Sequence, residues 1–148
     1  MAASPTPQPE QIADAVRDGM AANDRALHAL GIAIVAISPG AATAAMSVRE
    51  DMLNGHDICH GGLIATLADT AFAYACNAYD ELTVASGFGV DFVAPARLGD
   101  RLEARCTEVS KTGRTGVYDV VVTNQRGERV AVFRGRSYTA RGRPAVPR

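Results

Sequence analysis

One carboxylate, Asp69, stands alone in the most apolar stretch of the chain, residues 61–77. This stretch has a helical pattern, and the polar, glycine-bearing segment 54–60 leads directly into it. Burial of an unpaired carboxylate is costly, so such a group is neutralised, paired or used in chemistry. We therefore predict an active-site helix with Asp69 as its reactive group. The alternative is a buried Asp69 that is hydrogen-bonded to the backbone or to Thr66 and Thr70.

The composition favours one globular domain. The chain has 148 residues, 47% of them hydrophobic, which is enough for a core and argues against disorder. A formal net charge of −1 gives no reason to expect nucleic acid or an anionic membrane as a partner. No apolar run suits a bilayer span and no signal peptide is visible. Because Cys59, Cys76 and Cys106 are an odd, scattered set, we expect free thiols and a cytoplasmic location.

The periodicity of the whole chain predicts an α+β fold. A helical pattern starts at Pro9, and Asp24 and Gly31 bound a second short helix. Only one long helix lies between strands, and short hairpins imply antiparallel neighbours, so we predict a curved antiparallel sheet wrapped around that helix. The six strands are expected at residues 32–38, 41–48, 82–94, 101–109, 115–124 and 128–140.

The strand at 82–94 carries an unusual pair of glycines. Strict alternation places Val84, Phe88 and Phe92 on one face and Gly87 and Gly89 on the other, where close approach of a backbone or ligand is possible. The flanks are simpler: we expect a flexible N-terminus at 1–9, one domain at 10–140 and a flexible tail at 141–148.

Several stretches resemble one family. They are residues 54–56, 59–62, 67–77, 90–92, 98–100, 111–113, 116–120 and 130–137. Together they are similar to the hotdog-fold acyl-CoA thioesterases of the phenylacetic acid degradation (PaaI-like) type. The specific feature is His-Gly-Gly followed by Leu-Ala-Asp-Thr-Ala-Phe-Ala-Tyr-Ala-Cys. The similarity covers roughly residues 31–139, and leaves out the first helix and the tail.

The resemblance implies a hotdog fold and homodimers joined by their sheets. It further implies pairing into a homotetramer and hydrolysis of thioesters at the subunit interface. Coenzyme A belongs to the substrate, so no separate cofactor is expected. By motif position, Gly61 polarises the thioester carbonyl through its backbone N–H, and Asp69 is the catalytic carboxylate. Asn54 helps to place the water or the thioester, and His60 has a supporting role in the same loop.

Physical chemistry agrees with these roles. A helix N-terminus offers free N–H donors, and Gly61 and Gly62 leave no side chain to block a carbonyl oxygen that gains negative charge. The alternative is that both glycines only permit a tight turn. Asp69 lies two turns beyond Gly62, about 10 Å along the axis, which is too far for one reaction centre. We therefore expect Asp69 to serve a site completed by another subunit, as general base or as nucleophile.

Substrate contacts are predicted both for the coenzyme A portion and for the acyl group of the thioester. Lys111, Arg114 and Thr115, together with Gly62, are predicted to hold coenzyme A, because Arg and Lys suit phosphate oxygens. Arg134 or Arg136 are further candidates for the phosphates. Phe72 is predicted to contact the acyl group, and Tyr74, Phe88 and Phe92 are other candidates for an aryl-acyl pocket. Core packing is expected for at least two of these four aromatic residues.

Four residues of the segment 54–60 have alternative roles. Asn54 could organise an Asx turn, which is compatible with a catalytic role. A zinc site of His56, Cys59 and His60 is disfavoured, because no second Cys/His pair has suitable spacing, so we predict no metal. A Cys59 nucleophile is possible, but Asp69 is better placed.

We therefore predict an acyl-CoA thioesterase that hydrolyses a small aryl-acyl-CoA of the phenylacetyl or hydroxyphenylacetyl type in phenylacetate degradation. A ring-opened intermediate would also fit. The alternatives are a hotdog protein that binds acyl-CoA without hydrolysis and a hotdog hydratase or dehydratase. The latter would be expected to pair a His with a carboxylate.

Overall fold

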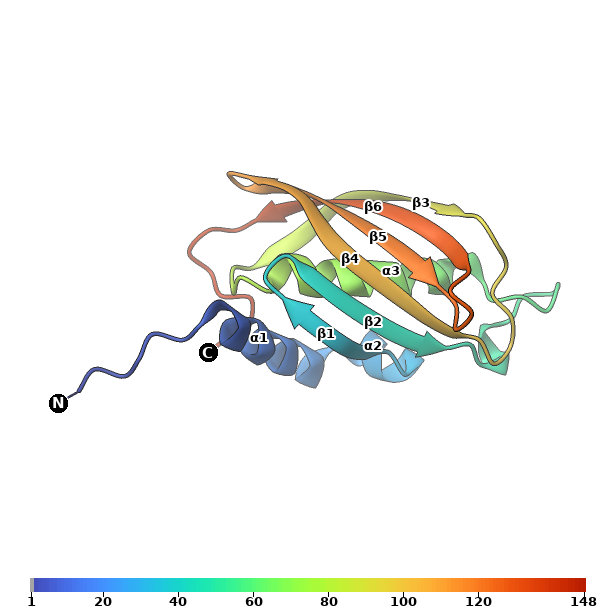
Figure 1. Ribbon diagram of the computed structural model, residues 1–148, viewed down its shortest axis with the longest axis horizontal. Coiled ribbons are helices and arrows are strands. Elements are labelled where there is room, and N and C mark those ends of the chain that lie inside the picture. The colour runs from blue at the N-terminus through green and yellow to red at the C-terminus, as the bar shows by residue number, and fades with distance from the viewer. Residues whose placement is uncertain (1) are drawn as a thin grey trace.

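The computed structural model describes residues 2–148, and it consists of one antiparallel sheet curved around a long helix (Figure 1). The part of the N-terminal expectation that concerns Met1 lies outside the described residues. The elements in chain order are α1 (Pro9–Asn23), α2 (Arg25–Leu30), β1 (Ala33–Ser38), β2 (Ala41–Ser47), the 3₁₀ helix η1 (Glu50–Met52), α3 (Gly61–Asn77), β3 (Thr83–Phe92), β4 (Arg101–Thr112), β5 (Thr115–Thr123) and β6 (Arg129–Thr139).

The sheet has six strands in the order β1-β2-β4-β5-β6-β3, and every neighbouring pair is antiparallel. Its concave face wraps α3, which packs mainly against β2, β4 and β5. The predicted hotdog arrangement of a curved sheet around one central helix is therefore confirmed. Strand β3 comes directly after α3 in the chain, yet it lies at the far edge of the sheet beside β6, so one of its edges has no neighbouring strand.

The core follows from alternation in the strands. On β4, Leu102, Ala104 and Cys106 point inward and are buried. The aromatic side chains of α3 complete this core: Phe72 and Tyr74 are both 0% exposed. Small residues along α3 allow the sheet to approach the helix closely.

The predicted facing of β3 is wrong at its start. The register with β6 shifts between Ala85 and Gly87, so Ser86 forms a bulge. Val84 pairs with Tyr138, on the outer face, whereas Phe88 lies on the inner face opposite Gly135. A bulge adds one residue to the strand, so each residue before the bulge faces the side opposite to the one that strict alternation predicts. Alternation in the sequence alone does not reveal the bulge.

The C-terminal end of the chain packs beside α1, and the loop between α1 and α2 is held by a helix cap. Asp24 caps α2 by accepting the Leu27 N–H at 3.0 Å, as expected of a helix N-cap. The tail at 141–148, predicted to be flexible, contacts folded elements. Val146 lies against Gly19 of α1, and Asp80 accepts the Ala145 N–H at 3.2 Å. Within residues 2–148, no helix is both long and apolar enough to cross a membrane.

Candidate active site

The loop before α3 is organised by the side chain of Asn54. Its Oδ1 accepts the N–H groups of His56 at 2.9 Å and Ile58 at 3.4 Å, so the predicted Asx turn is confirmed. Asp57 adopts a positive φ of 57°, a conformation that Asp and Asn tolerate better than most residues. The Asn54 amide nitrogen has no acceptor among residues 2–148, so it remains available to a ligand.

Two backbone hydrogen bonds then fix where α3 begins. The N–H of Cys59 donates to Ala96 at 2.8 Å, and the N–H of His60 donates to Met52 at 2.8 Å. The chain is thus held on both sides immediately before Gly61, the first residue of α3. In the part of the chain that the structure describes, the N–H groups of Gly61 and Gly62 donate to no protein acceptor. They are free donors at the positive end of a 17-residue helix.

These donors open onto an apolar pocket of about 520 Å³. Its volume lies in the range of small-molecule sites. The side chains carry no charge, and the amide of Asn54 is the main polar group. The pocket is lined by Asn54, Ile58, Cys59, Gly61, Ile64, Phe92, Val93, Ala94, Pro95 and Ala96.

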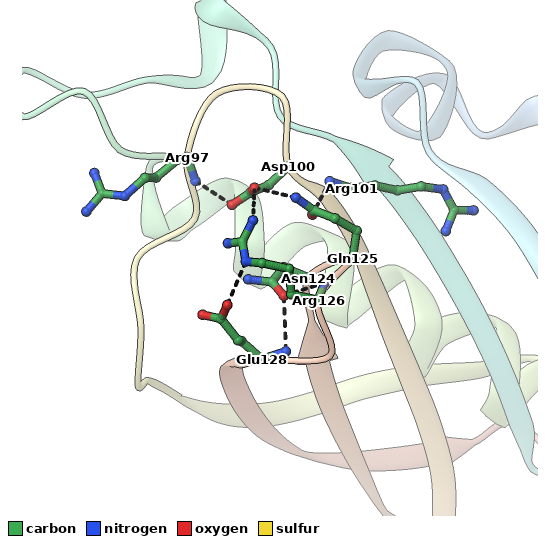
Figure 2. Close-up of polar contacts among 7 residues, drawn as sticks. All are labelled: Arg97, Asp100, Arg101, Asn124, Gln125, Arg126 and Glu128. Atoms are coloured by element: carbon green, nitrogen blue, oxygen red, sulfur yellow. Dashed lines mark hydrogen bonds and ion pairs between the residues drawn. The ribbon is translucent and has the colours of Figure 1, made fainter.

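A buried polar network anchors the segment 93–100, which supplies much of this pocket wall (Figure 2). Asp100 is 5% exposed, and its carboxylate accepts the Arg97 N–H and the Gln125 amide, each at 2.9 Å. Arg126 adds an ion-pair contact at 3.7 Å. The hydrogen bond from the Arg97 backbone, then that from Gln125, lowers the pKa of Asp100. The turn after the pocket segment is thereby tied to the β5–β6 turn.

Asp69 lies on the same helix as Gly61, but away from the pocket. It is half-buried, and its carboxylate has no hydrogen-bond partner within residues 2–148. Thr66 and Thr70 do not bond it, since their hydroxyls donate to the carbonyls of Gly62 at 2.8 Å and Thr66 at 2.7 Å. Burial raises the pKa of Asp69. The bonded alternative for Asp69 is therefore excluded in this chain, and the carboxylate is a stronger base than an ordinary Asp.

The separation of these groups is set by the helix. Gly61 and Asp69 are eight residues apart on one continuous α-helix, which corresponds to about 12 Å along its axis. Asp69 and the pocket donors of one chain therefore cannot meet at the same carbonyl carbon.

The thiol near the pocket is a poor alternative nucleophile. Cys59 is 3% exposed, and burial raises its pKa, so the reactive thiolate is disfavoured. His56 and His60 are exposed side chains of the same loop. In residues 2–148, no three His, Cys, Asp or Glu side chains gather as metal ligands.

The predicted contacts to coenzyme A lie elsewhere in the chain. Lys111, Arg114 and Thr115 sit at the β4–β5 hairpin, which lies at the upper left in Figure 1, whereas the loop before α3 lies at the right. Arg114 Nη1 donates to the Tyr138 hydroxyl at 3.2 Å, and the Lys111 ammonium lies 3.7 Å from the centre of the Tyr79 ring. One chain does not bring these residues to Gly61. Gly62, in contrast, is exposed beside Gly61, and a side chain there would meet nothing within 4 Å.

The prediction that Phe72 contacts substrate is corrected by its position. Its ring is fully buried, with centroids 5.5 Å from Tyr118 and 5.8 Å from Phe133, and it belongs to the core. Phe92 is the aromatic residue of the pocket instead. Phe92 is the last residue of β3. Only the folded structure shows that this end of the strand meets the start of α3.

Comparisons with known proteins agree with this geometry. The model of the thioesterase superfamily matches residues 56–131. The acyl-coenzyme A thioesterase PaaI of Escherichia coli K12 is 46% identical over 120 residues, which cover 81% of this chain and 86% of that protein.

Solved structures give the same result. The E. coli PaaI protein from the phenylacetic acid degradation operon superposes with a TM-score of 0.90 and 42% identity, covering 92% of this chain and 99% of that one. A mutant form of the phenylacetic acid degradation protein PaaI from Thermus thermophilus gives a TM-score of 0.76 and 38% identity, covering 79% of this chain and 100% of that one. The chain belongs to the thioesterase superfamily and is a thioester hydrolase with a hotdog fold.

Proposed function

We propose that this protein is a cytoplasmic acyl-CoA thioesterase that hydrolyses a small aryl-acyl-CoA, of the phenylacetyl or hydroxyphenylacetyl type, in phenylacetate degradation. The observation that carries the proposal is the free N–H of Gly61, which opens onto an uncharged, apolar pocket. A thioester carbonyl needs such a donor, and an aryl-acyl group needs such a pocket. The name and operon of the E. coli relative support the choice of substrate.

In this proposal the thioester oxygen accepts the N–H of Gly61, and the neighbouring N–H of Gly62 adds positive potential. The Asn54 amide, whose oxygen is engaged in the Asx turn, donates to the thioester or to water from the pocket wall. His60 supports the loop as the N-cap residue of α3. As the carbonyl carbon is attacked, negative charge moves to its oxygen, where the helix N-terminus stabilises it.

Asp69 drives the attack in one of two ways. As a general base it takes a proton from water while the water oxygen bonds the carbonyl carbon. As a nucleophile it forms an acyl anhydride that water then cleaves. Either way the C–S bond breaks, coenzyme A leaves as thiolate and is protonated, and the acid is released. The raised pKa of Asp69 brings it closer to the range suited to proton transfer near neutral pH. No cofactor is required by either route.

The site is completed by a second copy of the chain. Strand β3 offers ten residues with one unpaired edge, and it exposes Val84, Phe88 and Phe92 by 54%, 43% and 49%. A long apolar edge of this kind favours pairing with another strand. Antiparallel pairing of two β3 strands about a two-fold axis would place the Phe92 end of one copy beside the Thr83 end of the other.

This pairing also accounts for the position of the cationic hairpin. The Thr83 end of β3 lies near Thr115 and Arg114, because Thr83 pairs with Thr139 and Thr115 with Tyr138 on β6. In the dimer, the hairpin would therefore approach the pocket of the other copy. We assign Lys111, Arg114 and Thr115 to the phosphates of coenzyme A on this basis. Two such dimers would form the homotetramer.

The first test is the hydrolysis of phenylacetyl-CoA by Asp69→Asn and Asp69→Ala, followed through the free thiol that is released. We expect kcat to fall by about 10²–10⁴, the usual contribution of general acid–base catalysis. Asp57→Asn is the matched control, because it removes an exposed carboxylate nearby and Asn tolerates the positive φ. Undiminished turnover by folded Asp69→Asn would eliminate the catalytic role. Tight binding of phenylacetyl-CoA without turnover by the wild-type protein would indicate a binding protein.

The second test asks whether two chains share each site. Asp69→Asn and Gly61→Pro are co-expressed, each defective in a different half of the site. Because Pro is accepted at the first position of a helix, Gly61→Pro removes the N–H while α3 is retained. Random dimerisation gives about half mixed dimers with one intact site each, so about a quarter of wild-type activity should return. A site contained within one chain predicts no recovery.

A further inference from the structure

The end of β3 meets the beginning of α3 through one side chain. A Cβ placed on Gly61 would lie 2.9 Å from Phe92 Cζ, 3.0 Å from Cε2 and 3.3 Å from Cε1. The ring thus fills the space that any side chain at position 61 would occupy. The end of β3 and the start of α3 both lie at the right in Figure 1, and Phe92 and Gly61 both line the pocket. Phe92 therefore packs directly against Gly61, the residue whose free N–H is proposed to face the carbonyl.

The orientation of the ring leaves its faces available. The three atoms closest to Gly61 form the tip of the ring, and the side chain as a whole is 49% exposed. Its register partner on β6 is Ala131, which is too small to cover it. An aromatic ring with an open face interacts favourably with a second ring in offset or edge-to-face geometry.

The remaining wall of the pocket lacks another aromatic side chain. Ile58, Ile64, Val93 and Pro95 provide aliphatic surface, and no charged side chain is present. The other exposed aromatic of β3, Phe88, is engaged with Phe133 at a centroid distance of 4.7 Å. Aliphatic walls accept any apolar group of suitable size. Phe92 is the one ring in the pocket wall, so it is the residue that can distinguish aryl from alkyl groups.

We propose that Phe92 is a specificity-determining residue that selects an aryl-acyl group by ring–ring contact beside the carbonyl held at Gly61. This inference rests on the proposed thioesterase function. The acyl group lies between the Phe92 ring and the aliphatic wall, with its carbonyl oxygen toward the helix N-terminus. The same ring limits the size of the acyl group, since it closes the pocket on the side of β3.

The test compares phenylacetyl-CoA with cyclohexylacetyl-CoA, which has the same carbon skeleton without aromaticity, by release of free thiol. The ratio of their kcat/KM values isolates the ring–ring contact from apolar burial. We expect Phe92→Leu to reduce this ratio by about two- to tenfold, the effect of losing one aromatic pair. Phe92→Met, a second apolar variant, should act in the same direction. Phe92→Ala should additionally improve the relative rate with bulkier acyl groups.

Phe88→Leu is the matched control. It removes a ring from the same strand and the same face, with similar exposure of 43%, but Phe88 does not line the pocket. Circular dichroism and light scattering confirm that each variant keeps its fold and assembly. A ratio that is unchanged in folded Phe92→Leu and Phe92→Met, or equally changed in Phe88→Leu, overturns the assignment. Failure of the wild-type protein to cleave either thioester instead overturns the proposed function on which the inference rests.

Discussion

Gly61 offers the sharpest separation of steric from electrostatic effects in this site. Alanine and proline at this position both add a Cβ, but only proline removes the N–H. Both are compatible with the first helical residue, and the preceding residue, His60, has φ −56° and ψ 130°, an extended conformation that precedes proline readily. A comparison of Gly61→Ala with Gly61→Pro therefore measures the loss of the backbone donor together with the replacement of its hydrogen by proline Cδ, which also stands in the way of the carbonyl oxygen.

The shared steric effect follows from the distances to Phe92. A new Cβ would lie 2.9 Å from Cζ, whereas ordinary contact begins near 3.4 Å, so the ring must retreat by about 0.5 Å. Overpacking of this kind costs about 1–3 kcal/mol in a closed core, and less here because Phe92 is 49% exposed. We expect Gly61→Ala to lower the free energy of unfolding by about 1 kcal/mol or less. Since a 1 Å misplacement can reduce a rate about 100-fold, kcat/KM should fall about tenfold.

Proline adds the loss of the donor to this effect. Removal of one oxyanion-hole donor typically costs about 10²–10³ in kcat, so Gly61→Pro should be slower than Gly61→Ala by about that factor. The assay is thiol release from phenylacetyl-CoA, with chemical denaturation to confirm that both variants fold. Equal kcat values for the two variants would refute the assignment of the Gly61 N–H to the carbonyl oxygen.

Two carboxylates should show opposite pH dependence of stability. Burial raises the pKa of Asp69, so ionisation in the folded state is disfavoured. Asp69→Asn should therefore stabilise the protein by about 0.5–1 kcal/mol at neutral pH, and this gain should vanish at pH values below the unfolded pKa in denaturation curves. Hydrogen bonds from Arg97 and Gln125 lower the pKa of Asp100, so its contribution is present above the unfolded pKa and is lost as the pH falls through the folded pKa. Asp100→Ala should cost about 2–4 kcal/mol near neutral pH, against less than about 1 kcal/mol for exposed Asp119→Ala, and equal effects of both would contradict this account.

The sequence was informative where local rules dominate. Pro9, Asp24 and Gly31 act at helix ends, and the structure has helix boundaries at each of them. Periodicity predicted all six strands. Alternation gave the wrong facing at the start of β3, because the bulge at Ser86 depends on pairing with β6, a strand that lies about fifty residues later in the chain.

The residues of the candidate site show the same difference between features set by the local sequence and features set by the fold. Asp69 and Gly61 could be proposed from the sequence because an isolated carboxylate and a glycine pair stand out in a local pattern. The choice between Phe72 and Phe92 could not be made, because both are aromatic residues in apolar segments. Phe72 is buried under β5 and β6, whereas Phe92 ends a strand at the sheet edge. That difference comes from strand order, which places β3 beside β6 rather than beside β4.

Strand order also explains why Gly61, at the start of α3, and Asp69, at its middle, are expected to serve different sites. Only one side of α3 remains uncovered by the sheet of its own chain, because the sheet stops at β3. Asp69 is half-buried on α3, and in the proposed dimer we expect a second copy paired through β3 to approach it. Such a copy would run its own helix in the opposite sense, so its N-terminal donors would come toward this carboxylate. A spacing of about 12 Å, which prevents a site within one chain, would let two equivalent sites form across the two-fold axis of the proposed dimer.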